Sequence, residues 1–292
     1  MTKKTVSDTF PNHFLLEKNI FILLIILCGL FPTIDAQFYK PDSPYWDKEY
    51  NMSDLKKKID TSMLEVFYRH TVYDSILNIT RSNNEILQIG NKFSYNTTYP
   101  AFRYDSAMLA TFPEKCTNRD MNHVSQIFKY GLNNEYIKNL IDKTVTAVEP
   151  VTLSYAKYEE EIPQFQWTIM SDTTTIGGYH CQKATARFRG HTWEAWFTDE
   201  LGIDNGPWKL NGLPGLILQA RTADGTHKYD FAGMRDGGNF IFRADMRREL
   251  MTREKMIKAQ KDVGENGLIG IGIKGKNLQQ RKRTFYAPLE LE

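Results

Sequence analysis

Hydrophobic and polar side chains alternate along the stretch from residue 179 to residue 198. In its second half Trp193, Ala195 and Phe197 share one face, and polar residues occupy most positions of the other. A period of two residues, in a segment rich in aromatics and threonine, is typical of a strand with one buried face. Gly190 lies in the middle and can take the positive φ of a tight turn. The pattern therefore predicts an antiparallel hairpin.

Shorter alternating stretches on both sides predict more strands. They cover residues 63–70, 71–80, 85–89, 145–158, 164–170, 228–234 and 239–243, with a turn at 82–84 and a second hairpin formed by the last two. Residues 114–142 break the alternation and predict one or two helices, the first starting at a capping box that begins with Thr117 and the second near Asn134. Residues 245–261 predict another helix. We therefore expect a mainly β fold with helical insertions, in which one domain holds a curved, half-barrel-like antiparallel sheet; a β-sandwich is the alternative.

Two local features refine this picture. Pro214 and Gly215 stand where a type II turn needs a fixed φ and then a positive φ. A glycine-rich loop beside a buried strand can present N–H groups to an anion, but no helix follows here, so we expect the glycines to accommodate the bulk of Trp208. The run from Glu159 to Glu161 is expected to be a solvated loop.

Composition and charge bound the class of protein. The chain has 292 residues, of which 25% are charged and 13% aromatic, and its net charge is +2. These values are ordinary for a globular protein with a core. A near-neutral balance argues against a nucleic-acid partner, which would need a concentrated basic face.

The N-terminus predicts export. Lys3, Lys4 and Lys18 precede an apolar run over residues 20–31, and Ala36 offers a small residue for cleavage. This order is typical of a secretory signal, and the run is short for a membrane-spanning helix. We expect a periplasmic or secreted protein after cleavage near Ala36, with a retained anchor as the alternative. The predicted division is 1–36 signal peptide, 37–60 irregular segment, 61–262 β-rich domain, and 263–292 glycine-rich and then basic tail.

A set of motifs over residues 60–235 resembles the GLPGLI family of exported bacterial proteins. The residues that carry the resemblance are Gly178, Tyr179, Cys181, Gly206, Pro207, Trp208, Gly212, Leu213, Pro214 and Gly215. His191 departs from the family pattern, which has an arginine there, and so does the pair Leu201-Gly202. The resemblance implies no established activity, but an association with outer-membrane transport systems.

Removal of the signal would leave two cysteines, Cys116 and Cys181. In an oxidising compartment such a pair can form a disulfide. Two buried free thiols are the alternative, and both remain open at this point.

No catalytic constellation is evident. Cys181 as a nucleophile would need a histidine, but His180 faces the opposite side of the strand. The six histidines lack the short spacing of metal ligands, so we expect neither a metal nor a cofactor. A hydrolase could draw on Cys181 or on the acidic residues Glu194, Asp199, Glu200 and Asp204, whose separation the sequence does not give. On balance the residues favour a protein that is not an enzyme.

Aromatic residues are the remaining candidates for a binding site: Tyr179, Trp193, Trp196 and Trp208. Trp193 and Trp196 face opposite sides of the predicted hairpin, so one of them points away from its main buried face. We therefore expect a non-catalytic envelope protein that binds an apolar or peptide ligand, or docks on an outer-membrane transporter or another envelope protein. A purely structural subunit is the other alternative.

Overall fold

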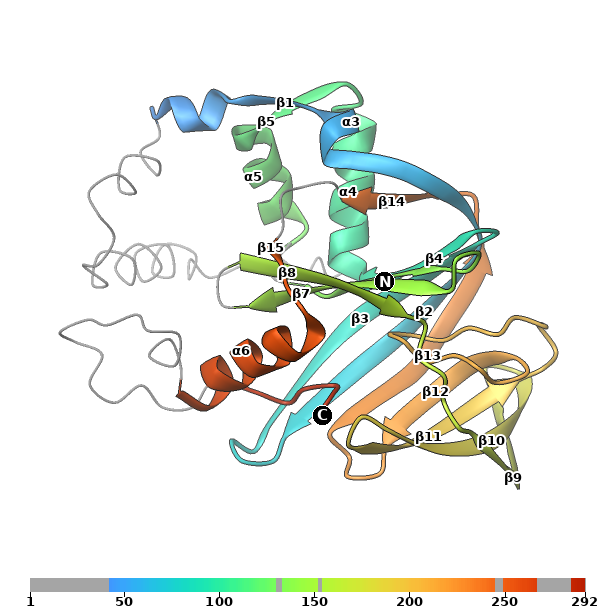
Figure 1. Ribbon diagram of the computed structural model, residues 1–292. Helices are drawn as coiled ribbons and strands as arrows, with labels where there is room; N and C mark the ends of the chain where they lie inside the picture. The colour runs from blue at the N-terminus through green and yellow to red at the C-terminus, as the bar shows by residue number, and fades with distance from the viewer. Residues whose placement is uncertain (1–41, 130–132, 152–153, 245–248, 267–284, 292) are drawn as a thin grey trace, which may run out of the picture.

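The computed structural model describes residues 42–129, 133–151, 154–244, 249–266 and 285–291 (Figure 1). The predicted signal segment and most of the predicted glycine-rich and basic tail lie outside them. Within the part that is described, no helix is both long and apolar enough to cross a membrane.

One 13-stranded sheet dominates the fold. Its strands are β2 (Lys56–Asp74), β3 (Ile79–Gly90), β4 (Phe93–Thr98), β6 (Glu135–Asn139), β7 (Thr144–Val151), β8 (Ser154–Glu161), β9 (Thr168–Ile176), β10 (Tyr179–Phe188), β11 (His191–Thr198), β12 (Leu216–Thr222), β13 (His227–Asp236), β14 (Phe240–Ala244) and β15 (Glu249–Leu250). The spatial order is β15-β8-β7-β6-β4-β3-β2-β13-β12-β11-β10-β9, with β14 also paired to β2. All pairs are antiparallel except β15 with β8. The predicted fold class is confirmed.

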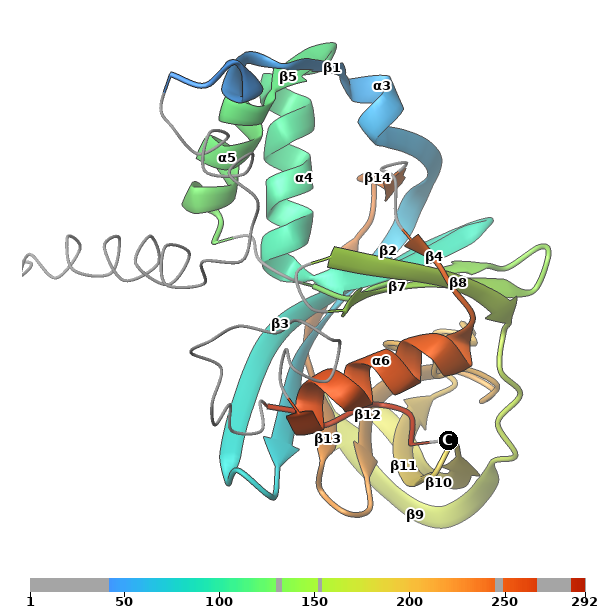
Figure 2. The ribbon, with the colours of Figure 1, turned by 60° about the vertical axis from the view of Figure 1, so that its left-hand side comes forward.

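The long strands β2 and β3 connect the two ends of this sheet, which curves around a concave side (Figures 1 and 2). Helix α6 (Arg253–Asn266) lies on that side and packs on β7 and β8. Its Met256 is buried in the main hydrophobic cluster. The helix therefore fills part of the hollow that the curved sheet leaves.

A second group of elements lies at the other side of the sheet (Figure 2). It contains η1 (Pro44–Asp47), β1 (Glu49–Asn51), α3 (Met52–Leu55), α4 (Tyr99–Thr111), β5 (Lys115–Thr117) and α5 (Asn118–Ile127). The predicted capping box at Thr117 is confirmed, because its hydroxyl and the carboxylate of Asp120 satisfy each other's backbone N–H groups. The helix predicted from Asn134 is wrong. That segment is β6, held between β4 and β7 by the ladder on each side, so pairing overrides its local helical pattern.

The predicted hairpin over 179–198 is confirmed as β10 and β11. Arg189 and Gly190 both have positive φ, 47° and 84°, as a two-residue turn that matches strand twist requires. Trp193, Ala195 and Phe197 are all buried. The second predicted hairpin is wrong, since β14 pairs with the first part of β2 and not with β13. The predicted turn at 82–84 is also wrong and lies inside β3.

Gly215 is required for a different reason than the sequence indicates. Its φ is not positive; the positive values nearby belong to Trp208 and Gly212. A Cβ on Gly215 would instead lie 2.0 Å from the carbonyl oxygen of Thr198. The glycine therefore permits two backbone segments to touch, which is the other use of this residue type.

Cys116 and Cys181, the two cysteines among the described residues, are free and lie in separate clusters. Cys181 belongs to the main cluster, whereas Cys116 packs with Met52, Met108 and Val124. Burial raises the pKa of both thiols. The disulfide alternative is therefore not what the structure shows.

Lys138 fixes the loop between β11 and β12. This buried lysine donates from Nζ to Asn205 Oδ1 at 3.0 Å, to the carbonyl oxygen of Gly206 at 3.0 Å and to that of Leu210 at 2.8 Å. Three acceptors match the three donors of an ammonium group. Burial lowers the pKa of Lys138 to about 7.

We expect Lys138→Met to lower the free energy of unfolding by about 2 kcal/mol, because it removes three buried hydrogen bonds and leaves Asn205 Oδ1 with only the backbone N–H of Gly206 as a donor. Denaturation in urea at constant pH measures the change. Lys92→Met, at an exposed position, is the control and should change it by less than about 0.5 kcal/mol. An unchanged Lys138→Met variant would show that the loop does not depend on these bonds.

Candidate functional site

The predicted site residues do not meet in one place. Trp193 and Trp208 are fully buried and stack at 5.3 Å between ring centroids, while Trp196 and Tyr179 are partly buried against the same core. None of the four lines the cavity between α6 and the sheet. Their role as ligand-binding residues stays a prediction.

Three of the four predicted acidic residues have local roles. Glu194 pairs with Arg221 and Lys183, and the hydrogen bond from Arg221 holds its pKa below the usual value. Glu200 accepts from the backbone N–H of His180, and Asp204 accepts from that of Gly212. These bonds explain the carboxylates without a catalytic role.

A different place has the features of a site. A cavity of about 380 Å³ lies on the concave side, between β2, β3, β7, α6 and the C-terminal segment. It is lined by His70, Val72, Arg81, Asn83, Glu85, Thr98, Asn133, Asn134, Glu149, Pro150, Val151, His227, Gln260, Val263, Gly264 and residues 285–289. Most of these side chains donate or accept hydrogen bonds. Apolar atoms nevertheless make up the larger part of the cavity surface, so the lining suits a ligand that has both polar groups and apolar faces.

A chain of hydrogen bonds forms one wall of the cavity. His227 Nε2 lies 3.0 Å from the carbonyl oxygen of Pro288, His227 Nδ1 lies 3.3 Å from His70 Nε2, and His70 Nδ1 lies 2.8 Å from Glu85 Oε1. A carbonyl oxygen only accepts, so His227 donates from Nε2 and its Nδ1 must accept from His70. His70 Nδ1 then shares a proton with Glu85. The contacts thus set the tautomer of both rings and present Glu85 to the cavity.

The surroundings of His227 keep its imidazole neutral. The residue is 1% exposed, and burial together with the nearby His70 lowers its pKa to about 3. Tyr229 stacks on the His70 ring at 4.0 Å, which holds that ring in place. The wall therefore contains a neutral His227 imidazole and a His70 ring that is stacked in place.

Glu149 lies on the opposite side of the cavity. It accepts from Tyr136 Oη at 3.1 Å and from Gln260 Nε2 at 2.9 Å. Burial raises its pKa, although Lys209 acts in the opposite direction. Burial raises the pKa of Tyr136, and the nearby carboxyls of Glu149 and Glu85 add to this rise.

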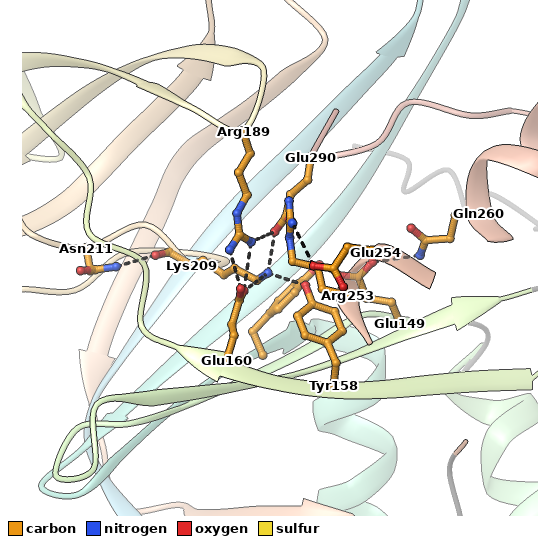
Figure 3. Close-up of polar contacts among 11 residues, drawn as sticks. Glu149, Tyr158, Glu160, Arg189, Lys209, Asn211, Arg253, Glu254, Gln260 and Glu290 are labelled. Atoms are coloured by element: carbon orange, nitrogen blue, oxygen red, sulfur yellow. Dashed lines mark hydrogen bonds and ion pairs between the residues drawn. The ribbon is translucent and has the colours of Figure 1, made fainter. Parts of the chain in front are cut away.

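Behind Glu149 lies a buried cluster of charged side chains (Figure 3). Lys209, which is fully buried, donates from Nζ to Glu160 Oε1 at 2.6 Å, to Glu290 Oε1 at 2.5 Å and to Tyr158 Oη. Arg189 contacts both glutamates, and Arg253 Nε lies 2.5 Å from Glu290 Oε2. Burial alone would raise the pKa of Glu290, but Lys209 and Arg189 hold it below the usual value. We call Tyr158, Glu160, Arg189, Lys209, Arg253 and Glu290 the ion cluster.

This arrangement could hardly be predicted from the sequence. The run that includes Glu160 was expected to be a solvated loop; it is part of β8, and Glu160 faces Lys209. Part of the predicted tail, residues 285–291, is packed against the cavity. The residues of the ion cluster come from points far apart along the chain, so no local pattern joins them.

Part of the chain matches a known protein family model. Residues 129–227 match the family model described as the N-glycanase peptide, N-terminal domain. No protein with a curated description matches the chain. The matched residues include six that line the cavity: Asn133, Asn134, Glu149, Pro150, Val151 and His227.

Three solved structures overlap with the chain more weakly. Two crystal forms of PNGF-II share 14% identity with it, at a TM-score of 0.45 and over 69% of this chain. The chain spans about a third of the length of that protein, 32% and 34% in the two forms. An outer membrane lipoprotein-sorting protein domain from Vibrio parahaemolyticus shares 8% identity at a TM-score of 0.20, over 63% of this chain and 86% of the domain. These overlaps do not establish a common fold.

The family match corrects two expectations. It assigns residues 129–227 to a model other than the GLPGLI family, although this stretch holds the motifs that carried the resemblance. In this chain Tyr179 and Trp208 pack against the core and Gly215 permits a close backbone approach, and residues with such roles do not separate one β-rich family from another. The same match overturns the expected function. That function was a non-catalytic envelope protein that binds an apolar or peptide ligand or docks on a transporter.

Proposed function

We propose that the cavity binds the carbohydrate part of glycoproteins. The observation that carries this proposal is the combination of polar side chains and apolar surface in the cavity, to which the region matching an N-glycanase domain contributes. Sugars present many hydroxyl groups and few charges. The amide groups of Asn83 and Gln260 and the imidazole of His70 can form hydrogen bonds with hydroxyls.

Aromatic rings support the same ligand class. Phe285 and Tyr286 line the cavity. The guanidinium carbon of Arg81 lies 4.2 Å from the centre of the Phe285 ring and keeps it in place. A ring at the edge of a polar cavity offers an apolar surface to the C–H face of a sugar, so both faces of such a ligand would find a partner.

Calorimetry with N-acetylchitobiose, the disaccharide next to asparagine in N-glycans, tests the proposal. We expect saturable binding that Asn83→Ala plus Gln260→Ala weakens about tenfold, a loss equivalent to about 1.4 kcal/mol. Trp196→Ala, at a position that does not line the cavity, is the control and should bind as the wild type does. Absence of binding, or loss of binding in the control alone, would reject the cavity as the sugar site.

The two carboxyl groups of the cavity favour a second candidate, hydrolysis of the bound glycan. Burial raises the pKa of Glu149 and so favours its protonated form, whereas Glu85 Oε1 lies 2.8 Å from Nδ1 of His70. Two carboxyls with different environments are the usual means of supplying an acid and a base to one reaction. Water would attack the anomeric carbon as its bond to the leaving group breaks; Glu149 would protonate the leaving group, and Glu85 would take a proton from the water.

Release of free glycan from a denatured glycoprotein, followed by mass spectrometry, tests this candidate. Glu149→Gln and Glu85→Gln should each abolish release and retain N-acetylchitobiose binding. Binding without any release by the wild-type protein would leave a recognition domain and reject the catalytic candidate.

We also infer that the protein is exported. The support is the order of Lys3, Lys4, the apolar run 20–31 and Ala36, which lie outside the described residues. Mass spectrometry of the mature N-terminus from native cells should show cleavage near Ala36. An intact Met1 in the envelope fraction would favour the retained anchor. An envelope protein as partner stays a prediction.

A further inference from the structure

The C-terminal segment, residues 285–291, forms a side of the cavity although it is remote in sequence from the other walls. Residues 285–289 line the cavity directly. The two residues that follow, Glu290 and Leu291, contact the turn between β10 and β11: Glu290 pairs with Arg189, and the N–H of Leu291 donates to the Arg189 carbonyl oxygen at 3.0 Å. The segment therefore crosses from α6 and β2 to the far end of the hollow.

Three kinds of contact hold it there. The N–H of Tyr286 donates to Asp74 Oδ2 at 3.0 Å. The carbonyl oxygen of Pro288 accepts from two imidazoles, His227 at 3.0 Å and His191 at 3.2 Å. The carboxylate of Glu290 lies in the ion cluster and is 6% exposed. These contacts, several of them buried, fix the position of residues 285–291.

We propose that residues 285–291 are a strap that completes the cavity, so that docking of the strap and binding of the carbohydrate stabilise each other. The inference rests on the proposed function for the identity of the ligand only; the docking of the strap does not depend on it. The coupling follows from two features, the shared wall and the hydrogen-bond chain.

The first coupling between strap docking and ligand binding comes from the wall that the strap contributes to the cavity. Without the strap, the side chains of Phe285 and Tyr286 leave the cavity, and a ligand loses the contacts that they offer. A ligand that contacts the docked strap binds the docked state more tightly, so by linkage it also favours docking.

The second coupling comes from the hydrogen-bond chain that runs from Pro288 to Glu85. The Pro288 carbonyl fixes the proton of His227 on Nε2, and this leaves Nδ1 free to accept from His70. His70 is then held with its Nδ1 toward Glu85. When the strap leaves, His227 loses the acceptor that sets its tautomer, and the orientation of the Glu85 carboxyl in the cavity is no longer imposed.

Two variants loosen the strap by unrelated means. Glu290→Gln removes the charge that Lys209, Arg189 and Arg253 hold. Gly264→Ala adds a methyl group that would lie 2.3 Å from Cγ of Tyr286, and leaves every charge in place. The matched controls are Glu254→Gln, an exposed acid next to Arg253, and Lys261→Ala, an exposed position of the same helix.

Hydrogen exchange of residues 285–291 and calorimetry with N-acetylchitobiose together test the proposal. We expect at least tenfold faster exchange of the Tyr286 and Leu291 amides in both variants without sugar, a dissociation constant raised at least tenfold, and slower exchange in the wild type when sugar is added. The controls should match the wild type in each measurement.

The outcomes separate the two proposals. If the wild-type protein does not bind the sugar but both variants release the strap, the proposed ligand is wrong, whereas the proposal that residues 285–291 dock as a strap is confirmed. If exchange is the same in the wild type and in Gly264→Ala, which cannot act through charge, the segment is not a strap. If both variants release it and the affinity is unchanged, the coupling is rejected.

Discussion

Lys209→Met is expected to lower the free energy of unfolding by about 3–5 kcal/mol, the usual cost of removing one partner from a buried ion pair. The ammonium group of Lys209 is fully buried and contacts Glu160, Glu290 and Tyr158. Methionine has a similar length, so packing changes little. Its thioether cannot donate to the two carboxylates, which then remain buried close to each other with only the arginines to balance them.

Guanidinium denaturation of the full chain measures this change, with Lys228→Met as the matched control. Lys228 pairs with Asp230 at 3.0 Å, but its side chain is 46% exposed. A pair of this kind contributes about 0–1 kcal/mol, so the control should unfold close to the wild type. Equal effects in the two variants would mean that the ion cluster is no more important than a surface pair.

The sheet could be predicted from the sequence wherever pairing is local. The hairpin of β10 and β11 is such a case, because its two strands are neighbours and one face alternates with the other. The capping box at Thr117 is another, since all its partners lie within four residues. In both cases the residues that determine the structure are next to each other in the chain.

Predictions failed where distant segments decide the structure. Residues 135–139 have a helical pattern, but they form β6 because β4 and β7 each supply a ladder. Gly215 matches the pattern of a type II turn, but the requirement at this position comes from the backbone of Thr198. A single sequence does not show which backbone will approach a glycine.

The candidate site was missed for the same reason. Glu160, Lys209 and Glu290 are separated by 49 and 81 residues, and each looks like an ordinary polar position in its own surroundings. His70, Glu85 and His227 are brought together by the pairing of β2 with β3 and β13. Three tryptophans were predicted as binding residues because large aromatic side chains are common in binding sites. Two of them, Trp193 and Trp208, are buried in the core.

Acid is expected to destabilise the protein through His227, and this is the second large effect. The pKa of this residue is about 3 in the folded state, because burial and His70 oppose its charge, against 6.5 for the ordinary side chain. Between these values the unfolded chain binds a proton that the folded chain does not, so stability falls as the pH falls from about 6.5 toward 3. The residue is 1% exposed, so solvent screens the effect little. The loss between pH 6.5 and pH 4 is about 3 kcal/mol from this residue, at about 1.4 kcal/mol for each pKa unit.

Comparison with His227→Gln isolates this contribution. Several carboxyls, among them Asp224, Glu160 and Glu290, have lowered pKa values and also cost stability in acid, but they do so in both proteins. Urea denaturation at pH 6.5, 5.5, 4.5 and 4.0 should therefore give a steeper fall for the wild type than for the variant. Parallel curves would show that His227 is protonated in the folded protein. The hydrogen-bond chain from Pro288 to Glu85 would then lack its accepting nitrogen, and the link between the strap and the cavity wall would be lost with it.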